Sequence, residues 1–162
     1  GEWNYFVEDY EACAYVYMTE YLNRRSVQEA LHVRPRGNRT VDWTVCSDAI
    51  NRAWPTADKH HPMMGLYREL LRAEGVRALV YSGDNDAVCS TIATELWIWD
   101  VANVTDQWRP WTVGGQVAGY TAGLGPGSRL RFATVHGAGH FVPETRPAQA
   151  LALLAKFLDA TW

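Results

Sequence analysis

The chain has 162 residues, which suits one domain or a large piece of one, and a domain of this size buries about 68–70% of the surface that its unfolded chain exposes. Its 15 basic and 18 acidic residues give a net charge of -3, and this balance excludes the broad basic surface that nucleic-acid binding needs. No apolar run approaches the ~20 residues of a membrane span, so we expect no membrane association. The first residues, Gly1-Glu2-Trp3-Asn4, have neither a basic segment nor an apolar core, so we expect any export signal to lie outside this sequence.

Helical and strand-like patterns alternate along the chain. Asn23 is the expected N-cap of the first helix, Pro62 stands near the first position of a later helix, and Gly75 ends that later helix. Gly114-Gly115 separates two short strand-like runs, as in a β-hairpin. In chain order, the predicted elements are helices over 24–32, 46–53 and 63–71, a strand over 76–82, a helix over 92–99, strands over 111–113, 116–120 and 130–135, and a helix over 148–158.

This order of elements predicts an α/β fold. Strands that alternate with helices favour a mixed, mostly parallel sheet that is flanked by helices. The sequence contains no repeat, low-complexity segment or linker, so residues 1–162 are expected to form a single segment of one domain. In sheets of this kind, functional residues collect on the loops beyond the carboxyl ends of the strands.

Two polar motifs follow predicted strands. Gly83–Asp86 comes after the strand over 76–82, and His136–His140 comes after the strand over 130–135. An acid and a histidine at neighbouring strand ends suit a hydrolase triad, in which the imidazole takes the proton of the nucleophile and the carboxylate fixes its tautomer. The pattern leaves open which of the two aspartates is the acid, and helix capping or a purely structural loop histidine are the competing interpretations. No Gly-x-Ser-x-Gly motif occurs, so the chain holds no recognisable nucleophile.

Cysteines and glycosylation motifs point to the secretory pathway. Cys13, Cys46 and Cys89 cannot all pair within the chain, so at least one is free or bonded to a partner. Asn38 and Asn103 each begin an Asn-x-Thr sequon, which is a glycosylation acceptor in exported proteins, where disulfides also persist. The alternative is a cytosolic protein with three buried thiols and sequons that occur by chance.

Six short segments, taken in order, form a family pattern: Tyr21–Arg25, Val27–His32, Trp43–Asp48, Tyr81–Asp86, Gly137–Pro143 and Arg146-Pro147. Together they resemble the carboxyl-terminal third of the serine carboxypeptidases, and the likeness extends from about Tyr15 to Leu158. Members of this family are α/β-hydrolases. Several of them, such as cathepsin A and the cereal serine carboxypeptidases, are cut into a large and a small chain joined by disulfides. The sequence is similar to their small chain, so we expect the carboxyl-terminal part of an α/β-hydrolase domain that a larger chain completes.

The resemblance implies roles for four residues. Asp86, the second aspartate of Gly-Asp-x-Asp, is the expected triad acid and His140 the expected base, while the nucleophilic serine is expected in a Gly-Glu-Ser-Tyr-Ala-Gly motif of the large chain. Cys89 matches a free cysteine near the active site of some members, and Phe141 matches a position that lines the pocket for the departing residue. Burial of Cys89 as a small hydrophobe, and core packing of Phe141, are the competing interpretations.

The resemblance also implies partners. Cys13 and Cys46 match small-chain cysteines that bond to the large chain, so two interchain disulfides are expected, with a Cys13–Cys46 bond as the alternative. A peptide substrate, a vacuolar, lysosomal or secreted location, and a homodimer of two-chain units belong to the same expectation, and no cofactor does. No metal site is expected either, because His60-His61 beside Asp58 point in different directions and lack a spaced third ligand.

The reaction that the resemblance implies is the release of carboxyl-terminal residues from peptides through an acyl-enzyme. Some similar proteins are instead acyltransferases that use glucose esters, and one plant relative is a hydroxynitrile lyase. Asp86 and His140 do not separate these activities. A hypothesis of another class is a non-catalytic role, in which the chain protects or stabilises partner proteins.

Overall fold

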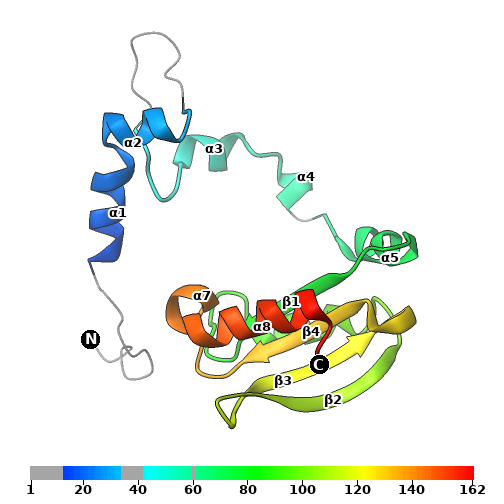
Figure 1. The fold of residues 1–162 in the computed structure, drawn as a ribbon. Coiled ribbons are helices and arrows are strands. Elements are labelled where there is room, and N and C mark those ends of the chain that lie inside the picture. The colour runs from blue at the N-terminus through cyan, green and yellow to red at the C-terminus, as the bar shows by residue number, and fades with distance from the viewer. Residues whose placement is uncertain (1–12, 34–41, 60) are drawn as a thin grey trace. The chain divides into compact units, whose positions relative to one another are not determined.

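The computed structural model describes residues 13–33, 42–59 and 61–162 (Figure 1). Pro62–Trp162 belongs to one compact unit, and the residues from Glu11 to His61 belong to a second. In these described segments, no helix is long and apolar enough to cross a membrane. That residues 1–162 form one segment of a single domain stays a prediction.

The smaller unit is helical where its residues are described. Its helices are α1 (Ala14–Leu22), α2 (Arg25–Ala30), α3 (Asp48–Ala53) and α4 (Thr56–Lys59). The prediction that Asn23 caps the helix over 24–32 is wrong, because Asn23 ends α1 and Arg24 precedes α2, the helix found in that range. The Asn23 side chain instead accepts from the backbone N–H of Trp43 at 2.7 Å and donates to the carbonyl of Trp43 at 2.9 Å, so it ties the α1–α2 corner to a segment before α3. This tertiary contact takes up the polar groups that a cap would use.

The larger unit is built around a four-stranded sheet with the order β1-β4-β3-β2 (Figure 1). Its strands are β1 (Ala78–Gly83), β2 (Val104–Val113), β3 (Gln116–Leu124) and β4 (Leu130–Val135). β2 and β3 form the predicted hairpin about Gly114 and Gly115, whose φ angles of +57° and +79° lie in the left-handed region that favours glycine. A short turn, η1 (Pro126–Ser128), leads from β3 into β4.

The mixed α/β class is confirmed, but the expectation of a mostly parallel sheet is wrong for the described strands. Only β1 and β4 are parallel, whereas β2–β3 and β3–β4 are antiparallel. The reason lies in the hairpin, because a two-residue turn joins antiparallel strands and a parallel connection needs a long crossover. β2, β3 and β4 therefore follow one another as a meander, and the meander returns β4 to the side of β1.

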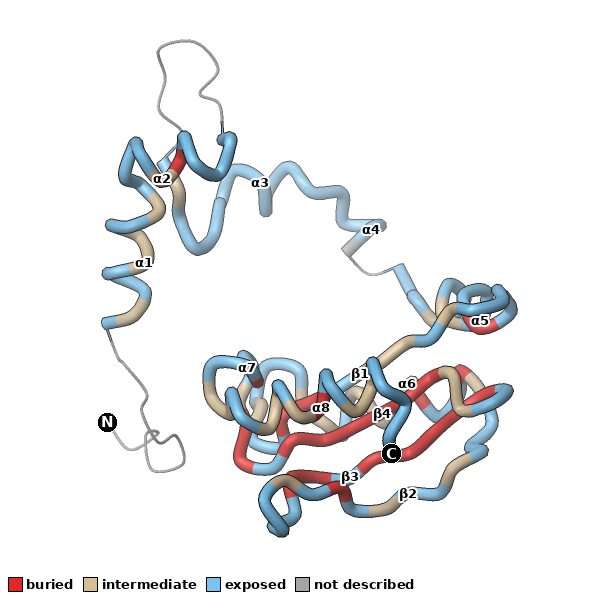
Figure 2. The backbone as a smooth tube through the Cα atoms, in the orientation of Figure 1, coloured by how far each residue is buried: buried red, intermediate tan, exposed pale blue. Residues whose placement is uncertain are grey.

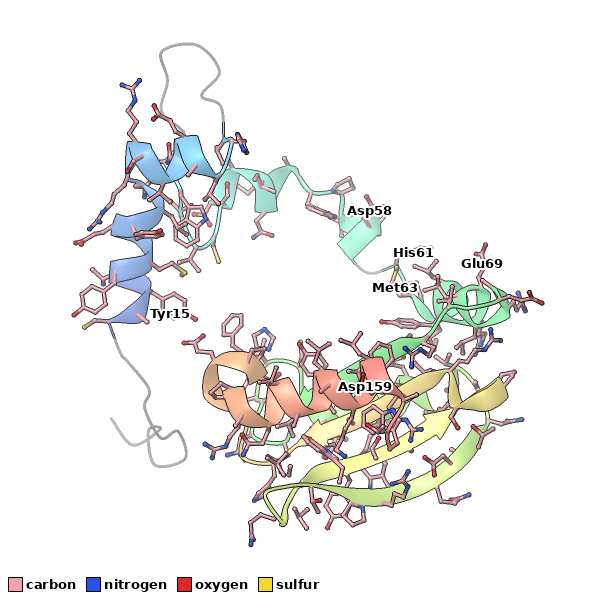
Figure 3. All side chains as sticks on the ribbon, in the orientation of Figure 1. Tyr15, Asp58, His61, Met63, Glu69 and Asp159 are labelled. Carbon is pink, nitrogen blue, oxygen red and sulfur yellow. The ribbon has the colours of Figure 1, made fainter. Side chains whose placement is uncertain are left out.

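Helices cover both faces of this sheet, since alternate residues of β4 point to opposite sides. α8 (Pro147–Asp159) packs Leu153 on one face, and Figure 3 labels Asp159 at the end of this helix. α5 (Met64–Arg72) and α6 (Thr91–Ile98) pack Leu71 and Ile98 on the other face. Figure 2 shows that burial is concentrated along β3 and β4, in the middle of the sheet. The sheet positions in the two cores are Trp111, Ala118, Ala133 and Val135 on the α8 side, and Leu124, Leu130 and Phe132 on the α5–α6 side.

Candidate active site

Two loops meet at one end of the parallel strand pair. β1 and β4 run in the same direction with their last residues opposite each other, so the loops over 84–89 and 136–141 leave the sheet together. A backbone hydrogen bond of 3.0 Å from Asn85 to Ala138 links them. Topology thus brings together residues that are far apart in the sequence, and it does so at the strand ends where functional residues were expected.

Asp86 and His140 form a hydrogen-bonded pair between these loops. Nδ1 of His140 lies 3.0 Å from Oδ2 of Asp86, while the backbone N–H groups of Val88 and Cys89 donate to Oδ1 at 2.7 and 3.1 Å. The side chain of Asp86 is only 5% exposed, whereas that of His140 is 41% exposed. A carboxylate that accepts from Nδ1 fixes the imidazole tautomer and leaves Nε2 able to take up a proton.

The surroundings of Asp86 keep its carboxyl group ionised. Burial by itself raises the pKa of Asp86, because a low-dielectric environment disfavours the charged form. The hydrogen bonds with His140 and with the Val88 and Cys89 amides act in the opposite direction and outweigh burial, so the pKa of Asp86 lies below its ordinary value. At neutral and mildly acidic pH, Asp86 is therefore an acceptor for the N–H of His140.

The pair opens into a cleft of about 250 Å³. Three of the predicted site residues, Asp86, Cys89 and His140, line this cleft together. The other walls of the cleft were not predicted from the sequence. Those from the end of β1 come directly before Asp84, and Val142, which begins the short helix α7 (Val142–Thr145), stands two residues after His140, so closeness to a motif could have found them. Thr94 on α6 carries no such signal. The missed residues are Tyr81, Ser82, Gly83, Thr94 and Val142.

Phe141 lies beside the histidine rather than in the wall of the cleft. Its ring meets the ring of His140 edge-on, with centroids 5.0 Å apart and an interplanar angle of 67°. Phe141 is 52% exposed, and Cys89 is exposed as well, so neither is packed in a core in this chain. Both side chains are thus open to a ligand or to a partner.

A second aspartate and a second histidine pair in the same two loops. Oδ2 of Asp84 lies 2.7 Å from Nδ1 of His136, and Oδ1 of Asp84 accepts the backbone N–H of Gly137 at 2.6 Å. Sequence reasoning without the family left the acid open between the two aspartates, and the geometry separates them, because Asp86 contacts His140 and Asp84 contacts His136. The two histidines lie in one loop and not on a helix, so they do not share a helix face as zinc-binding pairs do.

The other predicted positions are the two remaining cysteines and the two sequons. Cys13 and Cys46 are both exposed, and the thiol of Cys46 is free, so the alternative of a Cys13–Cys46 bond is not found. Asn103 is exposed immediately before β2, while Asn38 lies outside the described residues. Within the described segments, no group of three or more His, Cys, Asp and Glu side chains could hold a metal ion, and His60 lies outside them.

The family model described as serine carboxypeptidase matches residues 2–160. Among curated proteins of Arabidopsis thaliana, the chain is 38% identical over 157 residues to serine carboxypeptidase-like 38, and this match covers 96% of this chain and 31% of that protein. It is 39% identical over 153 residues to serine carboxypeptidase 24, covering 94% of this chain and 31% of the relative. It is 40% identical over 158 residues to serine carboxypeptidase-like 22, and this match covers 94% of this chain and 32% of that relative.

The chain spans about a third of the length of these curated relatives. The match nevertheless includes both loops of the cleft and almost every described residue. Similarity of this extent is more specific than a shared α/β architecture, which many unrelated activities use. The chain therefore belongs to the serine carboxypeptidase family.

Proposed function

We propose that this chain supplies the acid and the base of a serine carboxypeptidase whose nucleophilic serine lies on a larger chain. Asp86 is the acid of the triad and His140 is its base. The reaction releases carboxyl-terminal residues from peptides through an acyl-enzyme. The observation that carries the proposal is the 3.0 Å contact between Oδ2 of Asp86 and Nδ1 of His140, beside an open cleft.

In the proposed reaction, Nε2 of His140 takes the proton of the serine hydroxyl as its oxygen attacks the peptide carbonyl. Asp86, held by two backbone N–H groups, keeps the imidazole in the required tautomer and stabilises the imidazolium that forms. His140 then gives the proton to the amine of the departing residue, and an acyl-enzyme remains. A water molecule, deprotonated by the same nitrogen, releases the acyl group and restores the serine.

The exposed apolar surface of this chain supports the proposal of a larger partner. An apolar groove of about 400 Å³ runs beside β1 and α8, and Leu79, Tyr81, Leu151 and Leu154 are among its walls. β1 is an edge strand of the described sheet, so its free side is available for pairing. Contiguous apolar surface of this kind usually marks an interface. We propose that the larger chain covers it.

The other assignments belong to the same proposal. Cys13 and Cys46 bond to the larger chain, in an oxidising vacuolar, lysosomal or extracellular location, and Asn38 and Asn103 carry glycans. Cys89 and Phe141 contact the substrate, and the exposed ring of Phe141 beside His140 favours an apolar departing residue. Two-chain units that pair as homodimers are a further part of the proposal.

Mass spectrometry of the natively purified protein tests the two-chain arrangement. A fluorophosphonate probe, which labels activated serines, is added first, and the sample is measured before and after reduction. The proposal predicts that reduction releases this chain from a larger, labelled partner. A chain that runs alone, with no label on any partner, would leave a non-catalytic role as the better account.

The reaction itself is tested with a blocked dipeptide. The proposal predicts that the enzyme which the probe labels, when it is assayed without the probe, releases the terminal amino acid from this dipeptide. Asp86 and His140 would equally serve an acyltransferase or a hydroxynitrile lyase. An enzyme that carries the label but leaves dipeptides intact, while it transfers acyl groups from a glucose ester or cleaves a cyanohydrin, would contradict the peptidase assignment.

A further inference from the structure

We infer that Asp84 is a positioning residue, which fixes the start of the loop that carries His140. The inference rests on the proposed function, because it assigns to Asp84 the task of holding the proposed base in place. Asp84 itself does not touch His140 and is not among the walls of the cleft. Its effect on the reaction therefore has to pass through the loop.

Both oxygens of the Asp84 carboxylate make hydrogen bonds to this loop. Oδ1 accepts the N–H of Gly137 at 2.6 Å, and Oδ2 lies 2.7 Å from Nδ1 of His136. Hydrogen bonds to an ionised acceptor are about twice as strong as those between neutral groups. One side chain thus holds two consecutive residues of the loop, directly after β4 ends.

Gly137 is the place where the chain turns out of β4. Its φ of +69° lies in the left-handed region, and the residue is buried, so its N–H needs a partner within the protein. Asp84 is that partner. Without Asp84, the N–H of Gly137 would have to find water, and the turn would have to shift to reach it.

Three consecutive residues of one loop are bonded, in order, to the other loop. Asp84 bonds to His136 and Gly137, the backbone of Asn85 bonds to that of Ala138, and Asp86 bonds to His140. The contacts made by Asp84 and Asn85 come before the Asp86–His140 pair along both loops. They therefore set where the histidine loop begins its approach to Asp86.

The far end of the loop is anchored separately. The hydroxyl of Thr145 accepts the N–H of Gly139 at 3.2 Å and donates to the carbonyl of Phe141 at 3.1 Å. Removing Asp84 takes away two of the contacts that hold the start of the loop, while the Asn85–Ala138 bond and the Thr145 contacts remain. We expect a shift of His140 on a folded protein, and a misplacement of about 1 Å costs roughly 100-fold in rate.

The test uses the assembled enzyme and a graded series at position 84. Asp84→Ala removes both hydrogen bonds, and we expect kcat to fall about 10–100-fold with KM nearly unchanged. Asp84→Asn keeps an oxygen for Gly137 but loses the charge, so a smaller fall of about 3–10-fold is expected. Asp100→Ala, which removes an exposed carboxylate just beyond α6, is the matched control and should keep wild-type kcat.

A second readout does not depend on turnover. The Nδ1 proton of His140, hydrogen-bonded to Asp86, should give a low-field proton NMR signal, assigned by its absence in His140→Ala. In both Asp84 variants this signal should broaden through faster exchange with water. The broadening should be greater in Asp84→Ala than in Asp84→Asn. If the wild-type enzyme hydrolyses no peptide, the proposed function fails while this signal still tests the role of Asp84.

Three results would overturn the inference. The first is wild-type kcat in a folded Asp84→Ala enzyme. The second is a loss that appears in KM alone. The third is an unchanged His140 signal in Asp84→Asn, which also decides the matter if the alanine variant does not fold.

Discussion

Replacing Gly83 by alanine should separate the two loops of the cleft. Gly83 is the last residue of β1 and is buried against the loop that carries His140. A Cβ atom added to Gly83 would lie 2.5 Å from the carbonyl oxygen of Gly139 and closer still to that of Ala138, whereas ordinary contacts begin at 3.4 Å. Both neighbours are backbone atoms, so no side chain can rotate to make room.

The size of the effect follows from this distance. The His140 loop would have to move by roughly 1 Å to clear the new methyl group, and a displacement of that size costs about 100-fold in kcat. Overpacking at a buried position also lowers the free energy of unfolding by about 1–3 kcal/mol. The activity loss should therefore exceed what the modest loss of stability explains.

The assay compares Gly83→Ala with Gly65→Ala in the assembled enzyme. Gly65 lies in α5 and has open space where a Cβ would be, so alanine there should raise the free energy of unfolding by about 0.5–1 kcal/mol and leave turnover unchanged. Thermal unfolding and dipeptide hydrolysis are measured for both variants. Wild-type turnover in Gly83→Ala would refute the view that the close contact of these loops positions His140.

Three further changes test other parts of the account. Asp86→Asn should lower kcat by roughly 10⁴-fold, because an amide can donate to Nδ1 and favours the wrong tautomer. The pKa of Asp86 is lowered on folding, so its carboxylate stabilises the fold at pH values above the unfolded pKa of about 3.9. The difference in the free energy of unfolding between wild type and this variant should therefore shrink as the pH falls below that value. A difference that is constant with pH would contradict the assignment. Ser90→Ala should cost about 1 kcal/mol in urea unfolding, because Oγ of Ser90 caps α6 by accepting the N–H of Ala93 at 3.3 Å; an unchanged midpoint would show that this cap does not contribute. Phe141→Glu should shift the substrate profile toward basic departing residues, and an unchanged profile would remove Phe141 from the substrate pocket.

The elements that the sequence predicts well are those with a one-sided apolar pattern. β4 has the predicted bounds, and α8 extends the predicted helix by one residue at each end. The predicted strand over 111–113 is only the end of β2, whose earlier residues are mostly exposed and include Pro110. A strand without a buried face shows no alternation of polar and apolar residues, so pattern analysis does not detect it. Its pairing with β3 is what defines it.

Sheet direction was harder to predict, because it depends on which strands become neighbours. The alternation of helices and strands favours parallel pairing, yet among the described strands only β1 and β4 are parallel. That one pair is enough to bring the two motifs of the cleft together. The choice between Asp84 and Asp86 was not available from spacing either, because both stand in an irregular loop whose side-chain directions follow no period. The family motif favoured Asp86, and the contact with His140 agrees with that choice.

The most direct test of the central claim is the turnover of the assembled enzyme with His140→Ala in this chain. The imidazole is partly exposed and its removal leaves the two cores of the sheet untouched, so the variant should fold with a nearly unchanged melting temperature. The account predicts that dipeptide hydrolysis and fluorophosphonate labelling of the larger chain are both lost, because the group that takes the proton of the serine is gone. Full hydrolysis by the folded variant would contradict the claim that this chain supplies the base.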